Sequence, residues 1–195
     1  MTTETKATMD AGTKSDRTIF MTCTPVLTYP SPGNYGATLT WTQTGGDPNS
    51  MIGRVDANGN IRLTNMPNNA NYNDNVDITI DLDTSQLVDE NGNTVTGRFA
   101  TATEYSGTGP VTGYAWFCGI DANGNYDPDA PITVDGMSVT REGDTEILIN
   151  DDTADDAPNY AFCLGLVLSS KNNYYITLDP IISTKRGSTS FMLNE

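Results

Sequence analysis

Val76-Asp77-Ile78-Thr79-Ile80-Asp81-Leu82-Asp83 is the stretch that decides the fold of this 195-residue chain. Apolar residues hold every second position, and the positions between them hold only Asp or Thr. Successive side chains of a β-strand point to opposite faces, so this alternation predicts a strand with one buried face and one face in water. We expect Val76, Ile78, Ile80 and Leu82 to face a core.

Similar segments recur on both sides of this stretch, at the short spacing typical of a β-sandwich. Residues 114–120 and 160–168 are the most apolar segments and are predicted to be central strands. The other expected strands are residues 18–29, 37–43, 51–55, 61–64 and 174–182, the last of them paired with 160–168 across 169–173. In residues 18–29 we expect Ile19, Met21, Cys23 and Val26 on one face, until Pro25 disturbs the alternation.

The composition agrees with this strand pattern. Hydrophobic residues make up 36% of the chain, and 18 Gly and 10 Pro supply many tight turns. Short strands joined by such turns are typical of two packed sheets. We therefore predict an all-β fold, a two-sheet antiparallel β-sandwich (Ig-like or jelly-roll) of about eight to ten strands. Residues 18–195 are expected to form this single domain, and residues 1–17 a polar N-terminal arm.

The pentapeptide Asp-x-Asn-Gly-Asn occurs three times, at residues 56–60, 89–93 and 121–125. Asn-Gly favours the positive φ angles of a type I′ turn, so residues 56–60 are predicted to close a hairpin with that turn. The sequences that follow the three copies differ, which argues against a solenoid of repeats. We expect three separate turns with the same local chemistry.

The charge of the chain excludes some partners. Its net charge is −15, with 25 acidic and 10 basic residues, so binding to nucleic-acid phosphates or to an anionic membrane is not expected. No stretch is long and apolar enough to span a bilayer, and the first residues do not resemble a secretory signal. These features predict a cytoplasmic protein. Its cysteines, Cys23, Cys118 and Cys163, are expected to be buried thiols, with one disulfide left open as an alternative.

Catalytic motifs are missing from the sequence. Histidine is absent, which excludes Ser-His-Asp and Cys-His catalysis, and there is neither a Cys-x-x-Cys pair nor a glycine-rich phosphate loop. Paired carboxylates could hydrolyse glycosides, and Glu104, beside Tyr105, is the one glutamate on a clearly strand-like stretch. Nothing in the sequence separates an acid environment from a base environment, so we predict that the protein is not an enzyme.

Residues 121–129 offer a candidate calcium loop, because oxygen-bearing side chains stand at every second position. An EF-hand is excluded, since its sixth and twelfth positions would be Tyr126 and Ile132. A looser loop site remains open, and so does the alternative of an Asn-Gly turn followed by an Asp-Pro turn. A second acidic cluster, Asp151, Asp152, Asp155 and Asp156, is expected to be a solvated loop. The candidate ligands of calcium are Asp121, Asn123, Asn125, Asp127 and Asp129.

Aromatic residues offer a third kind of site. Two tryptophans and nine tyrosines could build a surface on which sugars stack. Trp116 lies in an apolar run and Trp41 has the same parity as Leu39, so both tryptophans are predicted to be in the core. Carbohydrate binding therefore lacks a distinctive anchor, but it stays open.

The last expected hairpin resembles a known family. Tyr174-Tyr175-Ile176-Thr177-Leu178-Asp179-Pro180-Ile181-Ile182 resembles the closing strand of the bacterial DP-EP family and is similar, more loosely, to inclusion-body proteins of the PixA and AidA type. Residues 183–186, Ser-Thr-Lys-Arg, replace the Glu-Pro of the DP-EP pattern, and the chain is longer than is usual for that group. The resemblance implies a cytoplasmic, non-enzymatic β-sandwich, some of whose relatives accumulate as ordered inclusions. It carries over no catalytic residues.

Together these features predict a structural or self-assembling protein, such as a component of an inclusion body, filament or particle, with other copies of the chain as its partners. A calcium-dependent or carbohydrate-binding module is the first alternative. A decoration protein of a phage or virus particle is the second, and it would require a heterologous partner.

Overall fold

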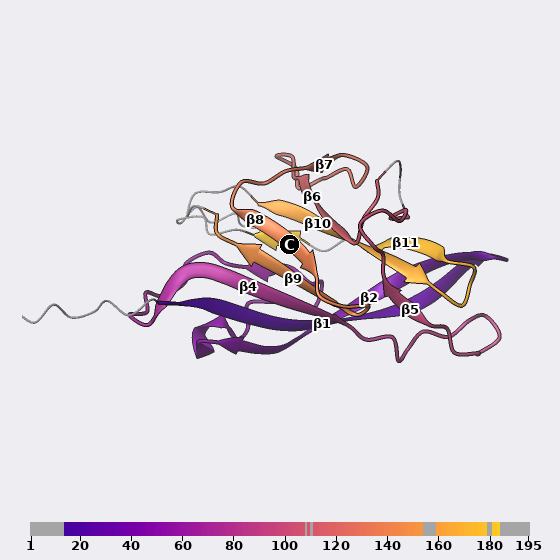
Figure 1. Cartoon of the computed structure of the whole chain (residues 1–195), viewed down its shortest axis with the longest axis horizontal. Coiled ribbons are helices and arrows are strands. Elements are labelled where there is room, and N and C mark those ends of the chain that lie inside the picture. The colour runs from indigo at the N-terminus through magenta and orange to yellow at the C-terminus, as the bar shows by residue number, and fades with distance from the viewer. Residues whose placement is uncertain (1–13, 108, 110, 154–158, 179–180, 184–195) are drawn as a thin grey trace, which may run out of the picture.

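The computed structural model describes residues 14–107, 109, 111–153, 159–178 and 181–183, and they form two facing β-sheets (Figure 1). The predicted all-β sandwich is confirmed. One sheet, sheet A, has the strand order β2-β1-β4-β9-β8, and the other, sheet B, has the order β3-β12-β10-β6-β7, with β5 and β11 also paired to β10. Strands β1, β2 and β4 run along the lower layer of Figure 1.

Several strands are only two or three residues long, so the strands outnumber the eight to ten expected. Sheet A contains β1 (Ser15–Ser31), β2 (Asn34–Asp47), β4 (Tyr72–Leu82), β8 (Met137–Arg141) and β9 (Glu146–Asp151). Sheet B contains β3 (Ile61–Arg62), β5 (Gly97–Phe99), β6 (Ala115–Gly119), β7 (Pro131–Ile132), β10 (Tyr160–Leu168), β11 (Tyr174–Leu178) and β12 (Ile181–Ser183).

Strand β4 is the middle strand of sheet A, and its alternation is confirmed. Val76, Ile78 and Ile80 are fully buried and Leu82 is almost so. Strand β9 pairs with it in antiparallel fashion, whereas β1 pairs with it in parallel, from Arg17 opposite Val76 to Cys23 opposite Leu82. The parallel β1–β4 and β3–β12 pairs are exceptions to the antiparallel arrangement expected.

Strand β1 differs from its prediction at both ends. It begins at Ser15, so the expected boundary between arm and domain is too late, and Arg17 is fully buried. The alternation also continues through Pro25 to Leu27, which is buried, while Val26 is 41% exposed instead of facing the core. Pro25 does not disturb it because pairing with β4 ends at Cys23, and proline is tolerated where a strand has a neighbour on one side only.

Strand β10 is the centre of sheet B, as predicted. It pairs with β6 and β5 along one edge and with β12 and β11 along the other. Phe162, Leu164, Leu166 and Leu168 belong to the core between the sheets, while Ala161 and Cys163 pack with Trp116 and Cys118 in a second cluster. Both faces of β10 are therefore covered, which explains its continuous apolar sequence.

Two parts of the strand prediction were wrong or incomplete. Residues 51–55, expected to be a strand, contain the end of a short 3-10 helix (Asn49–Met51) and a single bridge from Val55 to Ile61. The β8–β9 hairpin was missed, although Ile147 and Ile149 are buried on either side of the half-buried Leu148 in β9. No helix in the described part of the chain is long and apolar enough to cross a membrane.

Candidate functional site

The three Asp-x-Asn-Gly-Asn segments form the same turn, as expected. In the copy at residues 121–125, Asp121 Oδ1 accepts hydrogen bonds from the backbone N–H groups of Asn123 and Asn125, both at 2.8 Å. Asp121 Oδ2 accepts a third bond from Asn125 Nδ2 at 3.3 Å. The copies that begin at Asp56 and Asp89 repeat this pattern of bonds.

The turn type differs from the prediction. A type I′ turn needs positive φ at both central residues, but only the glycine of each pentapeptide has a positive φ, from 79° to 85°. The aspartate side chain instead accepts N–H groups that point into the loop, as in an Asx-turn.

This turn bears on the calcium prediction. The backbone N–H of Asn125, followed by its side-chain amide, lowers the pKa of Asp121, so that carboxylate is already stabilised by protein donors. Asp127 Oδ1 accepts the backbone N–H of Asp129 at 2.9 Å. In the described ranges, no three Asp, Glu, Cys or His side chains lie close enough to hold a metal ion. The hydrogen bonds of the turn form without a metal ion, and calcium binding by residues 121–129 stays a prediction.

The second acidic cluster is only partly a solvated loop. Asp152 is exposed, but Asp151 is fully buried, and its Oδ1 accepts bonds from both the backbone N–H and the hydroxyl of Thr153, at 2.9 and 2.6 Å. Its role is therefore to stabilise the end of β9. Asp155 and Asp156 lie outside the described residues, as do residues 1–13 of the expected arm and Asp179-Pro180 of the family resemblance.

The predicted burial of both tryptophans and of all three cysteines is confirmed. Trp41 and Trp116 are 5% and 7% exposed, so neither indole is available for stacking on a sugar. All three cysteines are buried, and burial raises the pKa of the Cys23 thiol to about 12.

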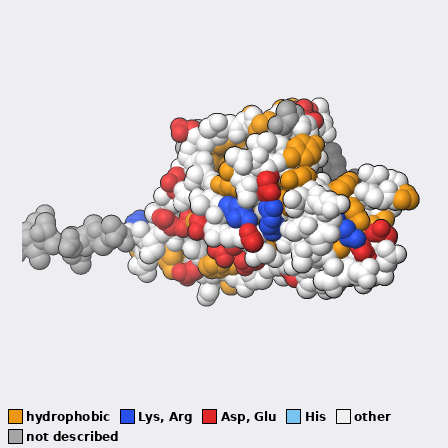
Figure 2. All heavy atoms as spheres, turned by 45° about the vertical axis from the view of Figure 1, so that its right-hand side comes forward, with side chains coloured by type: hydrophobic (Ala, Val, Ile, Leu, Met, Phe, Trp, Pro, Cys, Tyr) orange, Lys and Arg blue, Asp and Glu red, His pale blue; other side chains and the backbone are white. Residues whose placement is uncertain are grey.

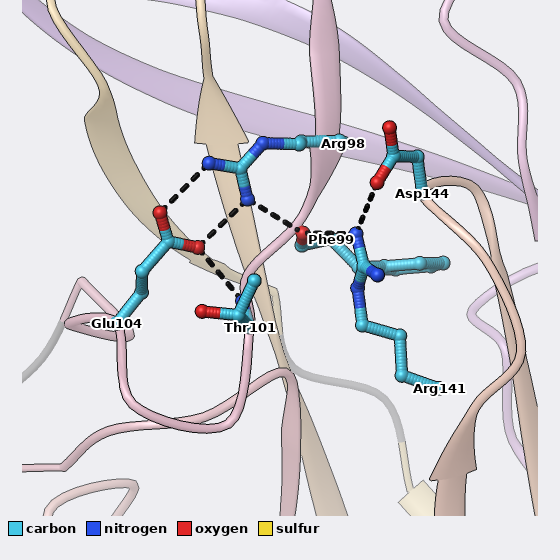
Figure 3. Close-up of polar contacts among 6 residues, drawn as sticks. All are labelled: Arg98, Phe99, Thr101, Glu104, Arg141 and Asp144. Carbon is cyan, nitrogen blue, oxygen red and sulfur yellow. Dashed lines mark hydrogen bonds and ion pairs between the residues drawn. The ribbon is translucent and has the colours of Figure 1, made fainter.

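Glu104, the one glutamate considered for glycoside hydrolysis, belongs to a cluster of ion pairs (Figure 3). Its two carboxylate oxygens accept bonds from the two Nη atoms of Arg98, both at 2.7 Å, and Thr101 N–H donates a third at 2.8 Å. These contacts, with Arg98 the strongest, lower the pKa of Glu104 from 4.5 to about 2. Such a carboxylate is ionised at neutral pH and is unsuited to be a general acid.

The same cluster connects the two sheets. The guanidinium groups of Arg98 in β5 and Arg141 in β8 both donate to the carbonyl oxygen of Phe99, at 3.1 and 3.4 Å (Figure 3). The backbone N–H of Phe99 donates to the carbonyl of Asp144 in the β8–β9 turn at 2.8 Å, and Asp144 also pairs with Arg141. We assign this cluster a structural role.

We expect Glu104→Gln to reduce the fall in the free energy of unfolding that occurs as the pH is lowered. A carboxylate with a lowered pKa stabilises the fold above its unfolded pKa, 4.5, and this contribution is lost as the pH falls towards about 2. The expected effect is about 1 kcal/mol, because the ion pair is partly exposed to water. Unfolding free energies at pH 6 and pH 3 measure it, with Glu146→Gln, on an exposed strand position, as the matched control. An unchanged pH dependence in Glu104→Gln would contradict this role.

Strand β2 forms an edge of sheet A, and the orientation of its backbone follows from its neighbours. Asp83 N–H donates to the carbonyl of Cys23 at 2.9 Å, so the backbone groups of Cys23 point towards β4 and away from β2. Cys23 lies opposite Trp41, which makes the N–H and C=O of Trp41 point away from β1. Backbone orientation alternates along a strand, so the N–H and C=O groups of Leu39 and Ala37 also point away from β1. Pro25, which has no N–H to donate, lies opposite Leu39, in agreement with this orientation.

The free edge of β2, defined here as the outward backbone groups of Ala37, Leu39 and Trp41, lacks the usual protection of edge strands. Within the described ranges β2 pairs only with β1, and residues 34–46 contain no charge and no proline. Natural edges commonly carry lysine, proline or a bulge that prevents pairing with another chain. The register shifts of the β1–β2 pair, at Phe20/Met21 and Thr28/Ser31, lie opposite the two ends of residues 34–46 and not opposite residues 37–41.

A groove lined by tyrosines lies beside the beginning of β2, and sequence reasoning missed it. Its volume is about 640 Å³, and it lies between the β1–β2 turn, the β10–β11 turn and the loop around Tyr105. The doublet Tyr174-Tyr175 that begins β11 was the available signal, because two consecutive strand residues point to opposite faces and one of them must be outside the core. The lining residues are Gly33, Tyr35, Tyr105, Gly107, Lys171, Asn172, Asn173, Tyr174 and Tyr175.

No protein-family model matches the sequence, and no curated protein matches it either.

Proposed function

We propose that this protein is a non-enzymatic structural protein that self-associates by pairing the free edge of β2 with the same edge of a second copy. The observation that carries the proposal is the uncharged edge from residue 34 to residue 46 in a chain with a net charge of −15. Like charges repel two copies over most of their surface. Edge-to-edge pairing brings them together where there is no charge.

The geometry suggests a specific register. With a two-fold axis at Leu39, that residue lies opposite its own counterpart, and Trp41 lies opposite Ala37 of the second copy. The N–H and C=O groups of all three residues point outward, and directly opposed residues of this kind exchange both hydrogen bonds. The two copies of sheet A would form one continuous antiparallel sheet across the axis.

Side chains on the outer face favour the same register. Thr38, Thr40 and Thr42 are exposed and point away from the core. In the proposed pair Thr40 lies opposite Thr38 of the second copy, and cross-strand threonine pairs are favourable neighbours in antiparallel sheets. An isologous contact of this kind closes as a dimer, so larger assemblies would need a further surface.

We expect Thr40→Glu to convert the associated protein into a monomer. The new carboxylate lies at the centre of the proposed contact, in both copies, and faces water in the monomer, so it opposes pairing without disturbing the core. Sedimentation velocity over a range of protein concentrations measures the change. Thr140→Glu is the matched control, because Thr140 is exposed on β8 at the opposite edge of sheet A.

A second variant tests the backbone contact itself. Ala37→Pro removes an N–H that points away from β1, so it should weaken association while the β1–β2 ladder is kept. A wild-type protein that stays monomeric at high concentration would overturn the proposal, and so would association that survives both substitutions. Repeating the runs in millimolar calcium and in chelator tests the calcium prediction separately, because association in calcium alone would implicate residues 121–129.

A further inference from the structure

We propose that the tyrosine groove is a binding site for a neutral carbohydrate. The inference does not depend on self-association through β2, and it names a ligand class for a surface outside the outward backbone groups of Ala37, Leu39 and Trp41. Figure 2, which turns the right-hand end of Figure 1 forward, shows hydrophobic side chains there among uncharged ones, with only a few charged groups.

The wall formed by Tyr35 is held in place by its neighbours. Its ring packs edge-on against those of Tyr29 and Tyr174, with centroids 5.9 and 5.1 Å apart. Lys171 Nζ lies 5.8 Å from the centre of the Tyr35 ring and donates to Asp89 Oδ2 at 2.8 Å. Tyr29 in turn donates its hydroxyl to the carbonyl of Val88. A wall fixed in this way loses little conformational entropy when a ligand binds.

The opposite wall is more accessible. Tyr105 is 44% exposed, and its ring packs edge-on against Tyr175 with centroids 5.6 Å apart. Gly107 brings this loop close to β11, because a Cβ at that position would lie 2.7 Å from the backbone nitrogen of Thr177. Gly107 also has a φ of +100°, which favours glycine. The accessible ring is therefore held at a fixed height above the strand.

Amide groups form the rim between the two walls. Asn172 and Asn173 are exposed, and both have a φ of 54°, so the turn presents their side chains next to the tyrosines. Amides both donate and accept hydrogen bonds, as do tyrosine hydroxyls, which suits the hydroxyl groups of a sugar. The faces of tyrosine rings provide the apolar contact that sugar rings require.

The charge and the volume of the groove limit the class of ligand that it can bind. Lys171 is the cation that lines the groove, and Asp89 already neutralises it. Glu90 lies nearby and contacts the hydroxyl of Tyr35 at 3.3 Å. An anionic ligand would meet this carboxylate and a net charge of −15, so a neutral sugar fits better. The volume of about 640 Å³ is within the range of small-molecule sites and is large enough for a short saccharide.

The test is ligand-observed NMR of the full chain with glucose, galactose, mannose, N-acetylglucosamine and their common disaccharides. We expect saturable binding of at least one of them, and a loss of roughly tenfold or more in affinity for Tyr105→Ala, the size expected for one stacked aromatic ring. Tyr72→Ala is the matched control, because Tyr72 lies in β4 outside the groove and should bind as the native chain does.

Two further measurements keep the test interpretable. Thermal unfolding of Tyr105→Ala shows whether the variant is folded, and Asn172→Ala, on an exposed turn position, offers a second loss of binding if it is not. Binding that Tyr105→Ala and Asn172→Ala leave unchanged would overturn the proposal, as would no saturable binding of any of these sugars. Repeating the titration with Thr40→Glu separates the two proposals, because that variant should bind sugar normally even if self-association fails.

Discussion

Replacing Phe162 with alanine is expected to lower the free energy of unfolding by about 3–5 kcal/mol. Phe162 is fully buried in β10, and its ring packs against Trp41 of the opposite sheet, with centroids 6.4 Å apart. Truncation removes this contact between the sheets and leaves a cavity that the paired neighbours of β10 cannot easily fill. Denaturation in guanidinium chloride measures the loss.

Val26→Ala is the matched control for the core substitution. The sequence pattern places Val26 on the core face, but the structure leaves it 41% exposed, so its truncation should change stability by less than about 0.5 kcal/mol. The pair of variants therefore tests the register of β1 as well as the core. Equal losses for Phe162→Ala and Val26→Ala would contradict the arrangement described here.

Arg17→Ala is expected to cost about 2–4 kcal/mol, unusually much for an arginine. Its side chain is fully buried, with Nε donating to the carbonyl of Asn73 at 2.8 Å and Nη2 donating to that of Pro67 at 3.0 Å. The substitution opens a cavity and removes the side-chain link from β1 to the beginning of β4 and to the segment before it. Chemical denaturation measures the effect.

Two other arginine variants separate the effect of the buried contacts of Arg17 on stability from the effect of its charge. Arg62→Ala should be nearly neutral, because the Arg62 side chain is 65% exposed and its ion pair with Asp56 is 3.7 Å long. Arg17→Lys should lose much of what Arg17→Ala loses, since an ammonium group cannot reproduce the two directions of the guanidinium fork. Full stability of Arg17→Lys would mean that the positive charge alone accounts for the contribution of Arg17. Full stability of Arg17→Ala would mean that the buried contacts of Arg17 do not stabilise the fold.

The sequence predicts those parts of the fold in which one residue faces the core and the next faces water. Strand β4 is such a segment, and its face was assigned correctly. Residues 160–168 were identified as central because nine consecutive strand residues with little polarity need cover on both faces. Strand β9 was missed because its buried Ile147 and Ile149 form too short a pattern to stand out beside the turns around it.

Long-range features were out of reach for a single sequence. The parallel pairing of β1 with β4 joins residues more than fifty positions apart, such as Arg17 and Val76, and no local pattern specifies it. The burial of Arg17 follows from that pairing, so the residue was placed in a polar arm.

The candidate functional surfaces also divide into features that local sequence predicts and features that depend on the fold. The Asp-x-Asn-Gly-Asn turns were expected to share one chemistry because their bonds lie within five residues, and they do share it. The tyrosine groove combines residues from three distant turns and loops, among them Tyr35, Tyr105 and Tyr174, and could be found only after the chain was folded. The free edge of β2 likewise depends on which strand occupies its other side.

The position of β10 in the chain has a consequence for synthesis on the ribosome. This strand is the hub of sheet B and pairs with β5, β6, β11 and β12, yet it begins only at Tyr160. Strands β5 and β6 emerge long before it and have no central partner until it appears. The nascent chain must therefore hold β5 and β6 without their central partner while residues 120–159 are made, and such segments are prone to aggregate. We therefore expect the chain to depend on a chaperone during synthesis and to refold slowly after dilution from denaturant, because of this order of strands.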